Sequence, residues 1–434
     1  MTSNFTASIK AIFVSTLTFA IVGCPGTQSP TEETPLPTET ASTLPTSHEA
    51  AEPEPERAEP LKFVKPNLRE EELRDGWISL FDGTTLFGWE IPTETNWRVE
   101  DGTIVADSGE RSLLLTPFVF DDFQLRCDFH LAAGGNSGVF LRTAEDVSNP
   151  ATDTYELNIC DSHESHKTGS LVGRHVAADV PAVEGGWHTF DIRCAGTRIT
   201  VKLDGSEIVD FTDESDAQRL SGSIGLQMNA GRIAFRNIFL RPLNSTALFN
   251  GTDLAGLRTV PGSKSTFAVK DGAIHVADGP GFLETENTFG DFILHVEART
   301  NGDALNSGVF FRAMAGTEET PSHGYEMQIQ NGFNDGDRTT PADFGSGAIF
   351  RRAAARYVVA NDNEWMVETL IAQGDRFATF VNGYQVVNWQ DDRQPDENPR
   401  RGRRVEAGHI SLQGHDPTTD LDFRALRIHE LTSK

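Results

Sequence analysis

The chain has 434 residues, of which 38% are hydrophobic and 23% charged, and its formal net charge is −27. This length suits two folded domains of ordinary size. The strong negative charge excludes nucleic acid as a partner, because phosphates would be repelled. The one basic run, residues 400–404, is interpreted as a solvated loop rather than as a binding patch.

The first 24 residues are typical of an export signal. Lys10 is followed by an apolar run over residues 11–22, which is too short for a membrane span of about 20 residues. Residues 21–24 resemble a bacterial lipobox that ends in Cys24, and the alternative is an ordinary secretory signal with a chance cysteine. We expect an exported, periplasmic or cell-surface lipoprotein that a lipid on Cys24 anchors to a bacterial membrane.

Residues 25–66 are rich in Pro, Thr, Glu and Ser and lack apolar periodicity. Such a segment buries too little surface to offset its ordering entropy, so it is expected to be a disordered linker.

The rest of the chain contains a long internal repeat. The segment 136–142, NSGVFLR, returns as NSGVFFR at 306–312, and Tyr155-Glu156 returns as Tyr325-Glu326, both at an offset of 170 residues. A period this long indicates a duplicated domain rather than a solenoid unit of roughly 20–50 residues. We place the two domains at 67–243 and 244–434 and call them copy one and copy two.

The local pattern in both copies is that of β-strands. Apolar residues alternate with polar ones over 123–129, 199–203 and 377–381, as in half-buried antiparallel strands. Asp204-Gly205 and Asn382-Gly383 follow two of these runs and favour tight hairpins. The best helical segment, 70–74, is short. The sequence therefore predicts an all-β chain of two tandem sandwich or jelly-roll domains.

Three cysteines, Cys127, Cys160 and Cys194, follow the signal segment, all of them in copy one. Export would permit a disulfide, but the sequence does not choose a pair among the three. Copy two lacks counterparts, so the fold does not require a bridge.

The order of landmarks resembles that of the 3-keto-disaccharide hydrolase family, over residues 76–243 and again over 246–431. In copy one the landmarks are Gly76-Trp77, Phe81-Asp82-Gly83, Trp97, Asp101-Gly102, Asn136-Ser137-Gly138, Tyr155-Glu156, Gly186-Trp187, Asp204-Gly205, Gly225-Leu226-Gln227 and Phe235-Arg236. The resemblance implies a concanavalin-like β-jelly-roll and carbohydrate substrates, namely 3-keto-glycosides. These are cleaved by elimination of the C1 aglycone and hydration.

That chemistry needs a base for the C2 proton, a group that stabilises the enolate oxygen, and an acid for the leaving group. A divalent metal cation can supply the enolate stabilisation, although the sequence assigns it no ligands, and no organic cofactor is implied.

Catalytic candidates are Glu326 and His415 in copy two, with Glu156 in copy one. A carboxylate on a wet, sugar-binding face of the sheet suits catalysis, and the alternative for either Glu is an ordinary surface acid. His415 is the candidate base, because histidine is the side chain whose ordinary pKa lies nearest neutral pH, although an exposed loop histidine is the competing interpretation. Copy one has Asn229 where copy two has His415, so copy two is predicted to be the active copy.

Substrate-binding candidates come from the same motifs. They are Asn136, Arg142, Asp161 and Gln227 in copy one, and Asn306, Arg312, Gln328 and Gln413 in copy two. Strand alternation places Arg142 on the face of Gly138, where it would pair with Glu156 or clamp substrate, and the glycine suggests a close approach of the backbone. The asparagines are otherwise turn residues.

Other patterns carry less weight. His163, His166 and His175 are interpreted as parts of a Gly/Ser/His-rich mobile loop in preference to a metal site. The chain therefore has three candidate functions: an enzyme acting on 3-keto-glycosides, a non-catalytic carbohydrate-binding surface lipoprotein, and a structural adhesion protein.

Overall fold

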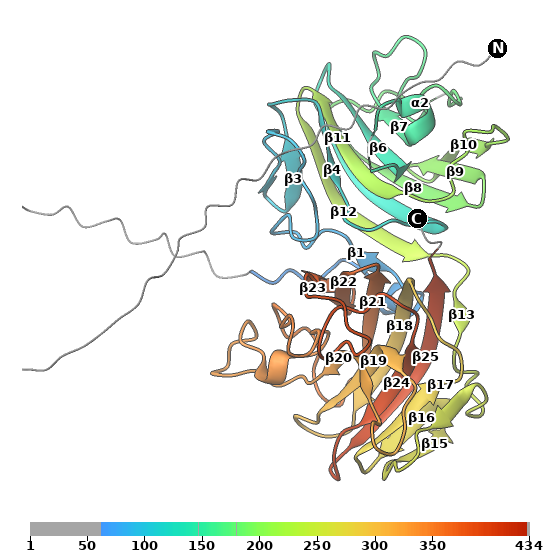
Figure 1. The fold of residues 1–434 in the computed structure, drawn as a ribbon. Coiled ribbons are helices and arrows are strands. Elements are labelled where there is room, and N and C mark those ends of the chain that lie inside the picture. The colour runs from blue at the N-terminus through green and yellow to red at the C-terminus, as the bar shows by residue number, and fades with distance from the viewer. Residues whose placement is uncertain (1–61, 146, 179, 432–434) are drawn as a thin grey trace, which may run out of the picture. The chain divides into compact units, whose positions relative to one another are not determined.

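The computed structural model describes residues 62–145, 147–178 and 180–431 (Figure 1). The predicted signal segment, Cys24 and residues 25–61 of the predicted linker lie outside these residues. The linker prediction is wrong at its end, because the ring of Phe63 stacks on that of Tyr357 with centroids 4.4 Å apart. The predicted short helix is confirmed as α1 (Glu70–Arg74), and a second helix is α2 (Pro150–Asp153).

Copy one is a β-sandwich of two antiparallel sheets. The larger sheet has the order β10 (Ser206–Thr212), β9 (Arg198–Leu203), β8 (Trp187–Ala195), β5 (Phe123–Leu131), β12 (Ile233–Pro242), β3 (Thr103–Ala106) and β2 (Arg98–Glu100), and β1 (Ile78–Ser79) also pairs with β12. The smaller sheet has the order β4 (Ser112–Leu115), β11 (Ser223–Ala230), β6 (Asn136–Thr143) and β7 (Tyr155–Ile159). Buried residues of both sheets form one hydrophobic cluster.

Copy two repeats this order and adds one edge strand, β14 (Leu257–Thr259), to its smaller sheet. Its larger sheet runs β23 (Tyr384–Gln390), β22 (Arg376–Val381), β21 (Met366–Gln373), β18 (Phe292–Thr300), β25 (Asp420–Glu430), β16 (Ala273–Ala277) and β15 (Thr266–Lys270), with β13 (Thr246–Ala247) beside β25. Its smaller sheet runs β14 (Leu257–Thr259), β17 (Gly281–Thr285), β24 (His409–Gly414), β19 (Ser307–Met314) and β20 (His323–Ile329). A short 3₁₀ turn, η1 (Ala342–Phe344), precedes β21. The predicted all-β, tandem jelly-roll architecture is thus confirmed.

The tight hairpins form where the sequence places them. Asp204 and Gly205 join β9 to β10 with φ of 50° and 84°, and Asn382 and Gly383 join β22 to β23 with φ of 47° and 78°. Two successive positive φ angles define the turn whose twist matches that of paired strands.

Burial follows the predicted alternation in copy one more closely than in copy two. Side chains of β5 alternate between buried and half-buried along its whole length, whereas β22 is buried at five successive positions. The reason is tertiary: Ile293, Ile371 and Phe380 of copy two join the hydrophobic cluster of copy one. The central strands β18, β21 and β22 of the larger sheet of copy two are therefore buried on both faces.

Cys127, Cys160 and Cys194 are buried and all three are free thiols. Burial raises the pKa of the Cys194 thiol to about 12, so it is held as the neutral thiol. Within the described residues, no helix is both long and apolar enough to cross a membrane.

Candidate functional site

The repeated Asn-Ser-Gly and Tyr-Glu motifs lie on adjacent strands of the smaller sheet. In copy two, Gly308 and Phe310 of β19 are in register with Gln328 and Glu326 of β20. Val309 between them belongs to the hydrophobic core. Because side chains alternate along a strand, Glu326 and Gln328 project from the opposite face of the sheet, which we call the site face.

A glycine in the middle strand makes room for the glutamate. A Cβ added at Gly308 would lie 2.9 Å from both Cγ and Oε1 of Glu326. In copy one the same Cβ at Gly138 would lie 3.4 Å from Cγ of Glu156. The close approach predicted from the sequence is confirmed: the carboxylate-bearing side chain lies across the glycine backbone.

Glu326 has an unusual electrostatic environment. Its side chain is only 7% exposed, and Oε2 lies 3.4 Å from a guanidinium nitrogen of Arg400. Burial raises the pKa of Glu326 to about 7, against the lowering effects of the nearby Arg400 and His415 charges. A carboxyl group that titrates near neutral pH can act as a general acid or a general base.

An acidic side chain that the sequence motifs did not identify lies beside Glu326. Asp343, in η1, accepts hydrogen bonds from Asn306 Nδ2 at 2.6 Å and from Gln328 Nε2 at 3.1 Å. Its charge also raises the pKa of Glu326. Asp343 has φ of 42°, and only the fold of the loop after β20 brings it to the site. No pattern in the sequence marks it.

His415 follows β24 at the edge of the site face. Its Nδ1 lies 2.9 Å from Oδ2 of Asp416, and its side chain is 41% exposed. The pKa of Asp416 is lowered to about 2, mainly by hydrogen bonds from Thr418 and from His415 itself. The ionised Asp416 therefore orients the imidazole, and its Nε2 is left for other contacts.

Several amide groups near Glu326 keep unused acceptors. Among the described residues, Oε1 of Gln328 and Oε1 of Gln413 are buried without a hydrogen-bond partner. In copy one the same is true of Asn136 Oδ1 and Gln227 Oε1. Buried acceptors without partners are costly, and hydroxyl donors of a sugar would satisfy them.

The copy-one site differs in its polar contacts. Glu156 accepts a hydrogen bond from Gln227 Nε2 at 3.3 Å, and burial raises its pKa. Asn229, at the position of His415, accepts a hydrogen bond from Arg111 Nε at 2.9 Å. An amide in this place cannot take a proton from a substrate.

The two candidate arginines do not reach the site face. Arg142 and Arg312 have fully buried side chains, and they pair with Asp122 at 3.0 Å and Asp291 at 2.8 Å. Both residues have positive φ, within a bulge that shifts the register of the pairing with the neighbouring strand. The bulge overrides the alternation on which the prediction of an Arg142–Glu156 pair depended. That pair, and a substrate role for either arginine, are wrong.

Asp161 is also a structural residue. Its Oδ1 accepts from Thr168 Oγ1 at 2.7 Å, and its Oδ2 accepts from the backbone of Val183 at 2.7 Å. In copy two Asn331 similarly accepts from the hydroxyl of Ser346 at 2.7 Å. The side chain therefore fixes the following loop, and its contact with substrate stays a prediction.

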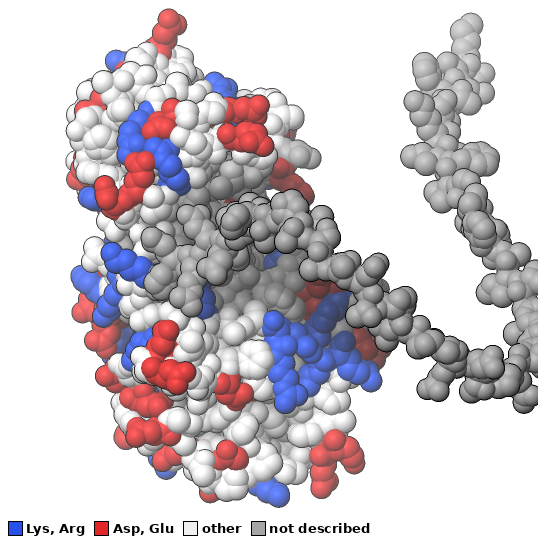
Figure 2. Space-filling view, turned by 90° about the vertical axis from the view of Figure 1, so that its left-hand side faces the viewer, with Lys and Arg blue, Asp and Glu red and all other residues white. Residues whose placement is uncertain are grey.

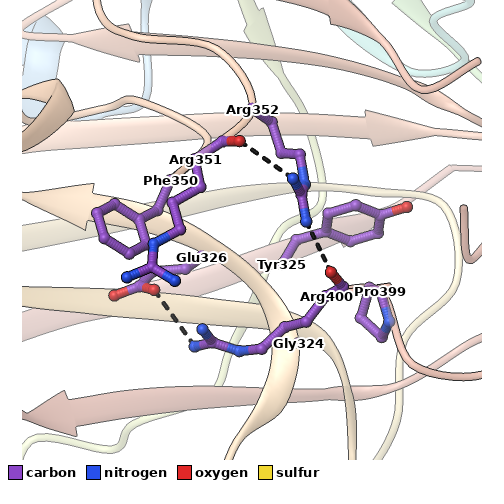
Figure 3. Close-up of a pocket in the computed structure, with 8 residues that line it drawn as sticks. All are labelled: Gly324, Tyr325, Glu326, Phe350, Arg351, Arg352, Pro399 and Arg400. Carbon is purple, nitrogen blue, oxygen red and sulfur yellow. Dashed lines mark hydrogen bonds and ion pairs between the residues drawn. The ribbon is translucent and has the colours of Figure 1, made fainter. Parts of the chain in front are cut away.

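The basic run is only in part the solvated loop that the sequence suggested, because Arg401 is exposed whereas Arg400 lines a pocket. Figure 3 shows Arg351 and Arg400 beside Glu326, and Arg352 beside Tyr325 and the carbonyl of Arg400, in a pocket of about 90 Å³. The lining residues are Gly324, Tyr325, Glu326, Phe350, Arg351, Arg352, Pro399 and Arg400. The loop that carries Arg400 is thus part of the wall beside the candidate acid.

The side chains do not form a ligand set for the divalent cation. Within the described residues, no group of three or more His, Cys, Asp or Glu side chains is placed to hold a metal ion. His163 and His166 instead accept hydrogen bonds from backbone amides of their own loop, at 3.0 and 3.2 Å.

Both copies are similar to known proteins. Residues 76–241 and 244–429 match the family described as 3-keto-alpha-glucoside-1,2-lyase-like domain. A 3-keto-disaccharide hydrolase of Bacteroides thetaiotaomicron is 30% identical over 138 residues, a match that covers 25% of this chain and 47% of that protein. The matched part thus spans about half the length of that relative.

Solved structures resemble parts of the chain. A Parabacteroides distasonis protein, provisionally named a glycosyl hydrolase, is 21% identical, with 41% of this chain and 98% of that one covered and a TM-score of 0.38. A carbohydrate-binding module of Bacillus subtilis is 19% identical, with 36% and 95% covered and a TM-score of 0.29.

Proposed function

This chain belongs to the family of 3-keto-alpha-glucoside-1,2-lyase-like domains, present in two tandem copies, and we propose that it is a carbohydrate-active enzyme that cleaves 3-keto-glycosides in copy two. The observation that carries the proposal is the buried carboxyl of Glu326 on the site face, with a pKa of about 7. His415 is close enough for its charge to affect that pKa.

The reaction begins at C2 of the sugar. A ketone at C3 acidifies the C2 hydrogen, and its removal by a base gives an enolate. The enolate collapses to an enone as the C1–O bond breaks, and the departing aglycone oxygen takes a proton from an acid. Water then adds at C1, and C2 regains a proton, to give the free 3-keto sugar.

Glu326 fits the role of the acid. Because its pKa is raised, a large fraction of the Glu326 carboxyl groups is protonated near neutral pH and has a proton for the leaving oxygen. An ordinary surface glutamate would be ionised there and unable to donate.

His415 fits the role of the base. The hydrogen bond between Nδ1 and Asp416 fixes the ring, and it favours the tautomer in which Nε2 accepts the C2 proton. Asp416 also stabilises the imidazolium that forms. His415 thus removes the C2 proton, and Glu326 donates a proton to the leaving oxygen.

The amides around Gly308 would hold the sugar. Gln328 and Gln413 have unused buried acceptors, and Asn306 is oriented by its bond to Asp343. Hydrogen bonds from these groups to ring hydroxyls would position C2 and the glycosidic oxygen for the two proton transfers.

The test is release of aglycone from a p-nitrophenyl 3-keto-glucoside, followed by absorbance. Elimination requires a primary isotope effect when C2 carries deuterium, whereas direct hydrolysis does not break that bond. Glu326→Gln is compared with Glu156→Gln, the matched change in copy one. No release by the wild-type protein, or equal rates in the two variants, would refute the proposal for copy two. Each assay is repeated with a chelator and with added Mg²⁺ or Mn²⁺. Loss of turnover in the chelator would mean that the reaction requires a bound cation.

For copy one we propose a different function, non-catalytic carbohydrate binding. Glu156 and Gln227 remain on the site face, but Asn229 replaces the base and is bonded to Arg111. In the inactive Glu326→Gln protein, calorimetry with the 3-keto-glucoside should give two sites per chain. Gln227→Ala should reduce the stoichiometry to one, and an unchanged stoichiometry would contradict binding by copy one.

Export and lipid anchoring by Cys24 are further proposals, supported by the signal-like residues 1–24. In a bacterial host that processes lipoproteins, the wild-type protein should be found with the membrane fraction. Cys24→Ser should release it or leave it unprocessed, and equal membrane association of both forms would contradict the anchor.

A further inference from the structure

We propose that the arginines beside Glu326 form a subsite for a negatively charged substituent on the sugar, such as a carboxylate, a sulfate ester or a phosphate ester. The proposal rests on the proposed function in one respect, since it takes the ligand of copy two to be a glycoside. The three arginines are Arg351, Arg352 and Arg400, and each reaches the wall of this pocket in a different way (Figure 3).

Arg400 lies in an insertion that copy one lacks. In both copies a tyrosine hydroxyl fixes the ends of this loop: Tyr325 bonds to Asp391 and Arg404, and Tyr155 bonds to Asp213 and Arg219. Asp391 and Arg404 are 13 positions apart, and Asp213 and Arg219 are 6 apart, so copy two has seven extra residues.

The inserted loop is held firmly. The backbone of Arg400 donates to Asn398 Oδ1 at 2.9 Å, and its carbonyl accepts from Arg352 Nη2 at 2.7 Å. Arg393 donates to the carbonyls of Pro399 and Gly402, both at 2.9 Å. The guanidinium of Arg400 is therefore presented from a fixed backbone, over the ring of Phe310 at 5.2 Å.

Arg351 occupies a backbone position that favours glycine. Its φ is 59°, and the equivalent residue of copy one is Gly173, with φ of 72°. The equivalence follows from the preceding residues, since the amides of Phe350 and Val172 bond to the carbonyls of Glu326 and Glu156. A bulky residue in the left-handed region is uncommon, and such strain gathers at functional sites.

Arg352 does not form the structural ion pair that its counterpart in copy one forms. Its counterpart in copy one, Arg174, is buried and pairs with Asp213. In copy two the equivalent Asp391 pairs instead with Arg393, at 2.7 Å. The side chain of Arg352 bonds only to the carbonyls of Arg351 and Arg400 among the described residues, so its charge has no carboxylate partner there.

The pocket therefore carries an excess of positive charge in a strongly negative protein. Three arginines and one acidic residue, Glu326, line the pocket, so positive charges outnumber negative ones at its wall. On the face drawn in Figure 2, Lys and Arg gather in compact patches among scattered acidic groups. Guanidiniums bind carboxylate, sulfate and phosphate through charge-assisted, often bidentate hydrogen bonds.

Glu326 itself links this subsite to the reaction. When Glu326 is ionised it competes for Arg400, and when it is protonated Arg400 is free to bind an added anion. Binding of the anion is therefore expected to strengthen as the pH falls through 7, the region in which Glu326 takes up its proton. The same proton serves the leaving group in the proposed reaction.

The experiment measures binding of four ligands to the purified protein by calorimetry: methyl glucoside, methyl glucuronide, methyl glucoside 6-sulfate and methyl glucoside 6-phosphate. We expect at least one charged ligand to bind about ten-fold tighter than the neutral one. This difference in affinity should become smaller at high salt. The three charged ligands differ in shape and charge, so the tightest identifies the substituent. Equal affinity for all four would overturn the proposal.

Three variants locate the effect. Arg351→Gln and Arg400→Gln should each remove most of the preference for the charged ligand. Arg401→Gln is the matched control, because it removes the same charge from the same loop at a side chain that is 69% exposed and paired with Asp396. An equal loss in Arg401→Gln would mean a general field effect and would overturn the subsite.

The outcome can be separated from that of the proposed reaction. Turnover of the neutral 3-keto-glucoside without any preference for charged ligands would leave the reaction standing and remove the subsite. A preference for charged ligands without turnover of neutral or charged 3-keto-glycosides would keep the subsite and remove the reaction.

Discussion

Copy one and copy two have the same strand order and the same glycine beneath the same glutamate, but different side chains around that glutamate. Copy two has His415 where copy one has Asn229, and its loops add arginines and Asp343. The sheets are thus a common scaffold, and the differences lie in the segments that follow the strands, where new residues cost the fold little.

The scaffold includes charges that are easily mistaken for site residues. Arg142 and Arg312 occupy equivalent bulges and bind equivalent aspartates and carbonyls. Their presence in both copies reflects the fold. Repetition within the chain therefore does not by itself mark a site residue, since the buried arginines repeat as faithfully as the glutamates of the site face.

The largest effect is expected from replacing the buried arginine that both copies share. Arg142→Ala or Arg312→Ala removes a fully buried side chain and leaves a half-buried aspartate and several carbonyls unpaired, which should cost about 3–5 kcal/mol in the free energy of unfolding. Urea unfolding followed by fluorescence checks it, with Arg198→Ala, an exposed pair with Asp210, as the control that changes little. A stable Arg312→Ala protein that had lost only sugar binding would restore the substrate role.

The second-largest effect is expected from replacing the glutamate of the site face, and it should differ between the two copies. Glu326→Gln removes the proposed acid and should lower kcat by about 10³-fold, within the range of general acid catalysis. Glu156→Gln should leave kcat within about two-fold, because copy one lacks the base. The measurement is aglycone release at saturating substrate; equal losses would mean that both copies contribute to turnover.

His415→Asn gives copy two the amide that copy one has. We expect kcat to fall by about 10²-fold, since water replaces the imidazole as a weaker base. The isotope effect at C2 should increase as proton removal becomes slower. A full loss of substrate binding, with kcat unchanged for the substrate that still binds, would instead make His415 a binding residue.

The smallest effect is a shift in the pH profile. Burial raises the pKa of Glu326 to about 7, so its protonated form, and with it kcat, should decline as the pH rises through 7. The charge of Arg400 lowers that pKa, so Arg400→Gln should move the decline to higher pH, by about one unit or less. Arg401→Gln should not move it, and a shift to lower pH in Arg400→Gln would contradict the assignment of Glu326.

Much of the fold was predictable from local patterns. The duplication followed from the spacing of NSGVF and Tyr-Glu, and the hairpins followed from Asp204-Gly205 and Asn382-Gly383. These features depend on intrinsic φ preferences and on strand alternation, which neighbouring residues decide. The site-face positions of Glu326 and Gln328 could be derived in the same way, because they lie in regular strands.

The sequence by itself determined two tandem all-β domains, the glutamate on each site face and the difference between His415 and Asn229. Only the tertiary structure decided that Arg312 is buried, that Asp343 joins Asn306, and that Arg400 faces Glu326. A bulge reverses the direction of a side chain without any local signal, and loops bring together residues that are far apart in the chain. The pKa of Glu326 likewise depends on burial and on charges from several segments, which no spacing along the sequence reveals.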